Sequence, residues 1–371
     1  MPPAETSLRG RFGVGDEFLR PGNNSIGFLR LVLASLVVLS HAFVLCGFDP
    51  PGHMYAKLAV SGFFFLSGML ITQSYLHSKS LIDYLWRRTL RIFPGFWGCL
   101  LFAAFVVTPL AMWLQHRPFP VHEAVGYVGH GLPMVGGRIS VGDVFAHNPV
   151  GNIMNGSLWT LPLEYFCYLV VSLIGVVGLL RFRWPVVVLA AVLYLWHVFP
   201  QTRLPAIPHA PNGLIADNVL EPYLMFAVGA SAHLWRKRIS FPNWLGILAF
   251  AVVLGIVLYE SPADQFQTLS RAVRVFALPV ALVWLATILP LQHFDRKRDL
   301  SYGTYIYAYP IQQTLVVAGL ANGWLLFLSS YALTLLMAFI SWHVVEGPAM
   351  RLKKVFAKRA PTPSGHVAQE A

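Results

Sequence analysis

The sequence predicts an all-α fold, a polytopic transmembrane helical bundle of about ten spans with both termini in the cytoplasm. Three observations lead to this fold class. Of the 371 residues, 56% are apolar and only 12% are charged, which is about half the charged fraction of a soluble domain. The apolar residues form separate blocks of about 20, the length that an α-helix needs to cross a bilayer. Lysine and arginine are concentrated in alternate connections between these blocks.

The apolar blocks give ten predicted spans. In chain order they cover residues 26–47, 56–76, 92–114, 156–179, 185–200, 217–235, 243–260, 272–290, 301–320 and 325–346. No small-residue cleavage site follows the first block, so it reads as a retained span rather than a signal peptide. The spans define one transmembrane domain, residues 26–350. A cytoplasmic segment, 1–25, precedes it, and a basic and then disordered cytoplasmic tail, 351–371, follows it.

Basic residues orient the bundle. With the N-terminus inside, the cytoplasmic connections hold 20 of the 27 lysines and arginines and the outer connections hold six, the bias expected of a multi-pass protein. The same bias explains the net charge of +11, and no basic domain or aromatic platform indicates a nucleic-acid partner. Membrane lipid is the partner that the composition implies. The three cysteines lack metal-binding spacing, so we expect no metal site.

Three ionisable residues fall inside predicted spans, where a charge is costly and usually functional. Arg30 and His41 lie in the first span and Glu164 lies in the fourth. At about 100° per residue, their separation brings Arg30 and His41 within roughly 20° of one helix face, about 16 Å apart along the axis. Arg30 could instead be a snorkelling interfacial anchor, and His41 could serve only an interhelical hydrogen bond.

Glu164 enters its span from outside, so we expect it at a membrane depth comparable to that of His41. A carboxylate beside a buried imidazole fixes the tautomer of the ring and stabilises its charged form, which is an arrangement suited to acid–base chemistry. His41 and Glu164 are therefore the candidate catalytic residues. The alternative is that Glu164 pairs with an arginine and serves packing alone.

Two arginines, Arg88 and Arg91, precede the third span at the cytoplasmic face. Because they are three positions apart, they share one helix face, and adjacent guanidinium groups suit bidentate recognition of phosphate. A phosphate-bearing donor on the cytoplasmic side is implied. On the opposite side, the loop 115–155 is rich in Gly, Pro and His. We expect this loop to be irregular, and it could cover an outward-facing acceptor site.

Six blocks in chain order resemble the bacterial membrane acyltransferase-3 family, which O-acylates surface polysaccharides, lipopolysaccharide and related glycans. The blocks are Phe28-Leu-Arg30 to Leu39-Ser-His41, Phe63 to Thr72 with Ser67-Gly68, Arg88-x-x-Arg91-Ile-Phe-Pro94, Asn155-Gly-Ser-Leu-Trp159 to Glu164-Tyr-Phe-Cys-Tyr168, Ser301 to Pro310, and Val345-Glu346-Gly-Pro348. Together they span most of the chain, and their order makes the resemblance specific. Two positions depart from the family pattern. Ser61 stands where many members have Asp, and Ala308 stands where many have His.

The resemblance implies an integral membrane O-acyltransferase of the bacterial cytoplasmic (inner) membrane. It implies acyl-CoA as co-substrate, with acetyl-CoA as the usual donor of the family, and no cofactor. The implied acceptor is a carbohydrate hydroxyl of a cell-surface or exported glycan. Arg30, Arg88 and Arg91 are the expected acyl-CoA-binding residues. Ser67 could donate a hydrogen bond to the thioester oxygen or simply pack there. His41 would be either a general base or the nucleophile of an acyl-imidazole, oriented by Glu164.

A transporter or flippase of a glycan or lipid-linked sugar is the main alternative, because a polar stripe can also be a translocation path. Such a protein would not need paired cytoplasmic arginines beside a mid-membrane histidine, and it would not consume acyl-CoA. Near the end of the last span, His343 and Glu346 could form a second acid–base pair, although Glu346-Gly-Pro348 also reads as a helix terminus. The acyl group, the glycan, the acylated position and the oligomeric state stay open.

Overall fold

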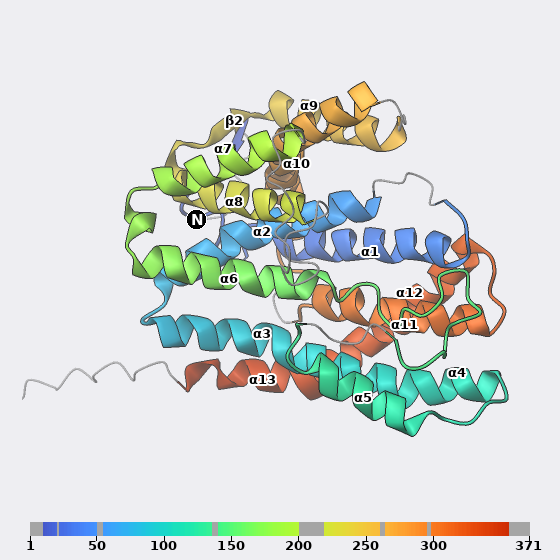
Figure 1. Cartoon of the computed structure of the whole chain (residues 1–371). Helices are drawn as coiled ribbons and strands as arrows, with labels where there is room; N and C mark the ends of the chain where they lie inside the picture. The colour runs from blue at the N-terminus through green and yellow to red at the C-terminus, as the bar shows by residue number, and fades with distance from the viewer. Residues whose placement is uncertain are drawn as a thin grey trace, which may run out of the picture.

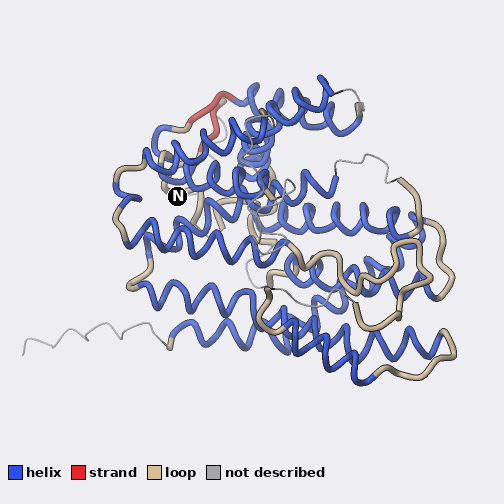
Figure 2. The backbone as a smooth tube through the Cα atoms, viewed as in Figure 1, coloured by secondary structure: helices blue, strands red, loops and turns tan. Residues whose placement is uncertain are grey.

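The computed structural model of the protein describes residues 10–20, 22–49, 55–135, 140–199, 219–259, 264–294 and 298–355. These residues form a bundle of α-helices (Figure 1) with one short pair of strands at its edge (Figure 2). Residues 356–371, which make up most of the predicted disordered tail, lie outside the described ranges. So do residues 1–9 of the predicted N-terminal segment.

The helices follow the apolar blocks of the sequence. In chain order they are α1 (Ile26–Leu45), α2 (Tyr55–His77), α3 (Leu81–Phe102), α4 (Thr108–Leu114), α5 (Val121–Gly131), α6 (Thr160–Val176), α7 (Trp184–Val198), α8 (Leu220–Leu234), α9 (Asn243–Leu258), α10 (Asp264–Ile288), α11 (Ser301–Val317), α12 (Gly323–Ser341) and α13 (Gly347–Arg351). A π-helical segment, Ala103–Val107, joins α3 to α4, and another, Trp342–Glu346, joins α12 to α13. A 3-10 turn, Leu352–Lys354, then follows α13.

Each of the ten predicted spans overlaps a helical element, which confirms the all-α prediction apart from one short strand pair. By length and composition, five of the described helices could cross a membrane: Ile26–Leu45, Tyr55–His77, Leu81–Leu114, Phe266–Ile288 and Gly323–Arg351. Three apolar helices, α6, α7 and α9, are shorter than a full span. Ten crossings and cytoplasmic termini therefore stay predictions.

Two local elements differ from the prediction. The loop 115–155, expected to be irregular, contains α5. Ala124, Tyr127 and Gly131 of this helix are buried at helical spacing, which allows it to pack on α3 despite its glycines. The N-terminal segment contributes a strand, β1 (Arg11–Gly13), which pairs antiparallel with β2 (Ser240–Pro242). Sequence periodicity does not reveal so short a pairing, because three residues carry too little pattern.

Helices α2 and α8 pack backbone against backbone. A Cβ atom on Gly68 of α2 would lie 2.1 Å from the carbonyl oxygen of Phe226, and one on Gly229 of α8 would lie 2.0 Å from that of Phe65. Glycine is therefore needed at both positions for this close approach. Gly68 follows Ser67 directly, so the contact fixes the part of α2 that carries a candidate site residue.

The helices are staggered along the bundle. Figure 1 shows α1 and α11 toward the right end and α6 and α8 toward the left end, with α3 and α13 side by side below α6. The first turns of α1, α6 and α11 thus come together near the middle of the bundle, where side chains from all three line one cavity. The stagger positions the candidate site.

Candidate functional site

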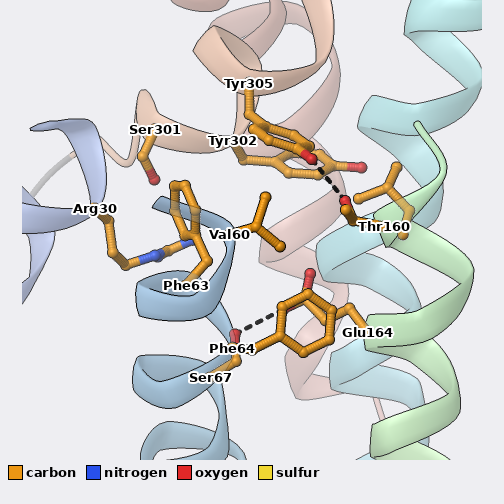
Figure 3. Close-up of a pocket in the computed structure, with 11 residues that line it drawn as sticks. Arg30, Val60, Phe63, Phe64, Ser67, Thr160, Glu164, Ser301, Tyr302 and Tyr305 are labelled. Carbon is orange, nitrogen blue, oxygen red and sulfur yellow. Dashed lines mark hydrogen bonds between the residues drawn. The ribbon is translucent and has the colours of Figure 1, made fainter. Parts of the chain in front are cut away.

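A partly open cavity lies between α1, α2, α6 and α11. Its lining, drawn in Figure 3, comprises Arg30, Val60, Phe63, Phe64, Ser67, Thr160, Leu161, Glu164, Ser301, Tyr302 and Tyr305. Helices α2, α6 and α11 each contribute residues three or four positions apart, which is the spacing that keeps side chains on one face, and α1 contributes Arg30. The structure thus brings together three of the predicted site residues, Arg30, Ser67 and Glu164.

Glu164 is held by hydroxyl groups. Ser67 Oγ donates to its Oε1 at 2.8 Å (Figure 3), and Tyr168 OH, one helical turn further along α6, donates to the same oxygen at 2.5 Å. Neither partner is basic, so Glu164 is not the packing partner of an arginine through a direct ion pair among the described residues. Its carboxylate faces the cavity with hydrogen-bonding capacity to spare.

A buried ion-pair chain borders the cavity on the side of Arg30. Arg30 Nη1 lies 2.6 Å from Oδ2 of Asp299, and Arg91 Nη2 pairs with the same oxygen. Arg91 also reaches Oε2 of Glu346 at 3.3 Å. The other oxygen of Asp299 accepts from Ser301 Oγ and from the Ser301 backbone N–H. One carboxylate therefore fixes two of the predicted donor-binding arginines.

Asp299 is a site residue that sequence reasoning missed. Burial opposes its ionisation, yet the guanidinium groups of Arg30 and Arg91 hold the pKa of its carboxyl well below the usual range. The sequence carries one signal for it, because an acidic residue two positions before a helix start is suited to cap the free backbone N–H groups there. Such a signal indicates a cap, and it gives no indication of the two arginines.

Arg88 lies close to the carboxylate that faces the cavity. The carboxylate of Glu164 and the hydroxyl of Tyr168 lie near enough to interact electrostatically with its guanidinium group. The Nε atom of Arg88 is buried without a hydrogen-bond partner among the described residues. The preceding arginine differs, because Arg87 Nε pairs with Asp83 at 2.8 Å. Of the two predicted phosphate-binding arginines on α3, Arg88 thus forms no ion pair in the described part of the chain, whereas Arg91 pairs with two carboxylates.

His41 lies outside the cavity lining. Its ring packs edge-on against Tyr309, with centroids 5.0 Å apart and an interplanar angle of 83°, and its Nδ1 is buried without a partner among the described residues. Tyr309 is one helical turn beyond Tyr305, which lines the cavity. Figure 3 shows a hydrogen bond between Tyr305 and Thr160, 2.7 Å long, at the cavity wall. His41 is therefore separated from the cavity by about one turn of α11.

The expected contact between His41 and Glu164 is absent among the described residues. The physical reason is the stagger of the helices. Glu164 lies in the first turns of α6, whose start is level with Arg30 because both line one cavity. Eleven residues of helix separate Arg30 from His41, about 16 Å along the axis. The expected membrane depth of Glu164 was based on a helix that begins at the outer surface, whereas α6 begins level with Arg30.

The segment before α6 contacts the aromatic neighbour of His41. Asn155 Nδ2 donates to the carbonyl of Ile306 at 2.8 Å, which holds this segment against α11. A Cβ atom on the following residue, Gly156, would lie 2.5 Å from Cε2 of Tyr309. The absence of a side chain at Gly156 thus allows Tyr309 to keep its place against His41.

We expect Gly156→Ala to reduce at least tenfold the acyl transfer that the family resemblance implies, because the ring of Tyr309 must shift and its contact with His41 is then lost. Transfer by detergent-solubilised protein would be compared with that of Gly129→Ala, where a Cβ atom meets nothing within 4 Å. Equal activity of the two variants would mean that the position of Tyr309 does not matter for transfer.

A second buried charged cluster lies outside the cavity lining. Arg274 of α10 donates to both carboxylate oxygens of Glu221, at 2.9 and 2.6 Å, and Ser61 donates to Glu221 at 2.7 Å. His197 Nε2 lies 3.7 Å from the same carboxylate. Arg274 is one of the six basic residues counted with the outer connections, but it lies within α10, is 2% exposed and has its charge balanced by Glu221. Ser61, which departs from the family pattern, takes part in this cluster.

The second possible acid–base pair does not form in the described part of the chain. His343 is exposed and its Nδ1 lies 2.7 Å from the carbonyl of Phe339. Glu346 is buried and accepts from Ser341 and Arg91. Both residues belong to the segment Trp342–Glu346, which is π-helical rather than a helix end.

Sequence comparison gives an independent view of the chain. Residues 23–343 match the model of a family described as an acyltransferase domain. Nodulation protein 10 of Rhizobium leguminosarum bv. viciae is 25% identical, over 94% of this chain and 98% of the relative. An O-acetyl transferase of Shigella phage Sf6 is 26% identical, over 87% and 95%. No solved structure matches the chain.

Proposed function

Because the chain belongs to the acyltransferase-3 family of membrane O-acyltransferases, we propose that it transfers an acyl group from cytoplasmic acyl-CoA to a hydroxyl of a cell-surface or exported glycan. Acetyl is the acyl group proposed, since the phage relative is named an O-acetyl transferase. One observation carries the proposal. Arg30, Ser67 and Glu164, predicted from three separate blocks of sequence, line a single cavity with Arg88 beside it.

The cavity would hold the thioester end of the donor. Arg30 and Arg88 would stand on the side from which a phosphate-bearing donor enters, and the pantetheine arm would occupy the cavity. Arg91 is bound to Asp299 and Glu346, so we assign it the task of fixing Asp299 and, through it, Arg30. Ser67 has one hydroxyl proton. The hydrogen bond from Ser67 to Glu164 would have to break before the hydroxyl could donate to the thioester oxygen.

His41 would act on the far side of the cavity wall. The thioester carbon would pass Tyr305 to reach the imidazole, and the acceptor hydroxyl would approach from the outer side, past Tyr309. In direct transfer, Nδ1 of His41 takes the hydroxyl proton, the acceptor oxygen bonds to the carbonyl carbon, and the carbon–sulfur bond breaks to release CoA thiolate. In the covalent route, the imidazole nitrogen attacks first and the acceptor then displaces it. In both routes Glu164 holds Ser67 at the cavity until the thioester oxygen replaces Glu164 as the acceptor of its hydroxyl proton.

The test uses purified protein in lipid vesicles of bacterial phospholipid. Acetyl-CoA is added with and without glycan from the native host, and free thiol is measured together with the mass of the glycan. Release of CoA that depends on both substrates, with a matching gain in glycan mass, supports the proposal. A glycan transporter would move glycan across the vesicle membrane and release no CoA, and that result would overturn it. Propionyl-CoA and succinyl-CoA in the same assay define the acyl group.

A further inference from the structure

Five basic side chains of the described residues gather where α3 begins and the chain leaves α13. We call this group the basic cluster: Arg30, Arg87, Arg88, Arg91 and Lys353. Lys353 was read from the sequence only as one of the cytoplasmic charges that orient the bundle. In the structure its charge interacts with Arg87, Arg88 and Arg91.

Carboxylates neutralise only part of the basic cluster. Arg87 pairs with Asp83, and Arg30 and Arg91 share Asp299. Arg88 and Lys353 form no ion pair with any carboxylate in the described ranges. Both side chains are half-buried, and a half-buried charge that lacks a counter-ion destabilises the fold. The uncompensated positive charge is therefore confined to two neighbouring side chains.

A specific contact holds Lys353 in this group. Trp86 Nε1 on α3 donates to the carbonyl of Leu352 at 3.0 Å. The 3-10 turn Leu352–Lys354, which carries Lys353, is thereby fixed against α3 in the segment that carries Arg88. Arg88 and Lys353 are about 265 positions apart in the sequence, so no local sequence motif includes both. Their proximity is a property of the fold.

We infer that Arg88 and Lys353 form an anion site that binds the phosphates of acyl-CoA, with Lys353 as a donor-binding residue contributed by the C-terminal segment. The inference rests on the proposed function. Glu164 acts on Arg88 and faces the cavity, so an anion here would lie at the cavity's edge. A thioester in the cavity and phosphates at Arg88 and Lys353 are then parts of one extended ligand. A phospholipid headgroup offers the same phosphate chemistry, and the test separates the two sources.

The charge of Lys353 is sensitive to pH near neutrality. Burial, together with the positive charges of Arg88, Arg91 and Arg87 on α3, lowers its pKa to about 8, while Asp299 between α10 and α11 acts in the opposite direction. Lys353 is thus cationic below about pH 8 and neutral above it. The phosphate monoester of CoA has a second pKa of about 6 and is almost fully ionised around pH 8, so donor binding is expected to weaken as the pH rises through 8.

The first test compares Lys353→Met, Lys353→Arg and Arg351→Met. Arg351 is exposed two residues earlier on the same segment, which makes it a matched control. Lys353→Met is expected to raise the KM for acetyl-CoA roughly 10-fold at pH 7 with kcat changed less than about 2-fold, because one charge-assisted phosphate contact is lost. Lys353→Arg and Arg351→Met are expected to keep the normal KM. A normal KM for Lys353→Met would overturn the inference.

The second test measures the KM for acetyl-CoA from pH 6.5 to 9. The KM of the unaltered protein is expected to rise above pH 8. That of Lys353→Arg is expected to stay low, because a guanidinium keeps its charge, and that of Lys353→Met is expected to be high throughout. Parallel curves for the three proteins would overturn the inference, since a purely structural role for Lys353 predicts no difference in their pH dependence.

The third test identifies the source of the phosphate. Binding of CoA to the detergent-purified protein and binding of the protein to phosphatidylglycerol vesicles are measured for the unaltered protein and for Lys353→Met. A loss confined to CoA binding supports the inference, and a loss confined to vesicle binding overturns it in favour of a lipid headgroup. If the unaltered protein releases no CoA from any acyl-CoA, the proposed function fails. If it does release CoA and Lys353→Met matches it in KM and CoA binding, only the inference fails.

Discussion

His41→Ala is expected to reduce acyl transfer by about 10²–10⁴-fold, the contribution of a positioned general base or nucleophile. The geometry of the ring supports this expectation. Its Nδ1 is buried without a partner among the described residues, so no hydrogen bond has to be broken before it accepts a proton. The ring is also fixed edge-on by Tyr309, which limits its rotation. The measurement is glycan-dependent CoA release per molecule of purified protein.

His343→Ala is the control for this variant. The ring of His343 is exposed on the segment Trp342–Glu346, so its removal is expected to change transfer by less than about 2-fold. Protein level in the membrane is measured for both variants, because a loss of folding would imitate a loss of chemistry. If His41→Ala keeps more than a tenth of the normal activity at an equal protein level, His41 has no part in proton or acyl transfer.

Asp299→Asn is expected to destabilise the protein by about 3–5 kcal/mol, the cost of removing one partner from a buried ion pair. Arg30 and Arg91 both depend on this carboxylate. The lower end of the range is the expected value, because the Arg30 side chain is 22% exposed and water can compensate part of its charge. Asparagine keeps the shape of the side chain, so the loss reports charge rather than packing. The measurement is thermal unfolding in detergent.

Asp143→Asn provides the comparison. Asp143 pairs with Arg117 at the surface, where the two side chains are 59% and 36% exposed, and exposed pairs of this kind contribute at most about 1 kcal/mol. Asp299→Asn is therefore expected to unfold at a clearly lower temperature than Asp143→Asn. Equal melting temperatures would mean that the ion pairs of Asp299 with Arg30 and Arg91 do not stabilise the fold.

The sequence was sufficient to predict the long apolar helices, although not α5, because the signal of an apolar helix is local. Twenty apolar residues in a row specify a helix wherever they occur in the chain. It was not sufficient for Arg274, because an arginine read alone is a topology signal. Only the fold reveals that Glu221, 53 positions away, neutralises its charge.

Three residues that line the cavity were predictable from the sequence, whereas the position of His41 relative to them was not. Arg30, Ser67 and Glu164 lie on one cavity because each follows its own helix face, which periodicity records. The relation of Glu164 to His41 depends on where α6 begins along the bundle, and a sequence pattern contains no such information. The roles proposed for Lys353 and Asp299 could not be predicted from the sequence, for one common reason. Each acts on residues far away in the chain.

The glycine contact between α2 and α8 restricts how the enzyme can open. With carbonyl oxygens of one helix against the α-carbons of the other at Gly68 and Gly229, no layer of side chains is left to slide or rotate, so the two helices move as a single rigid body. Ser67 belongs to that body. If the cavity opens, the helices expected to move relative to α2 and α8 are therefore α1, α6 or α11.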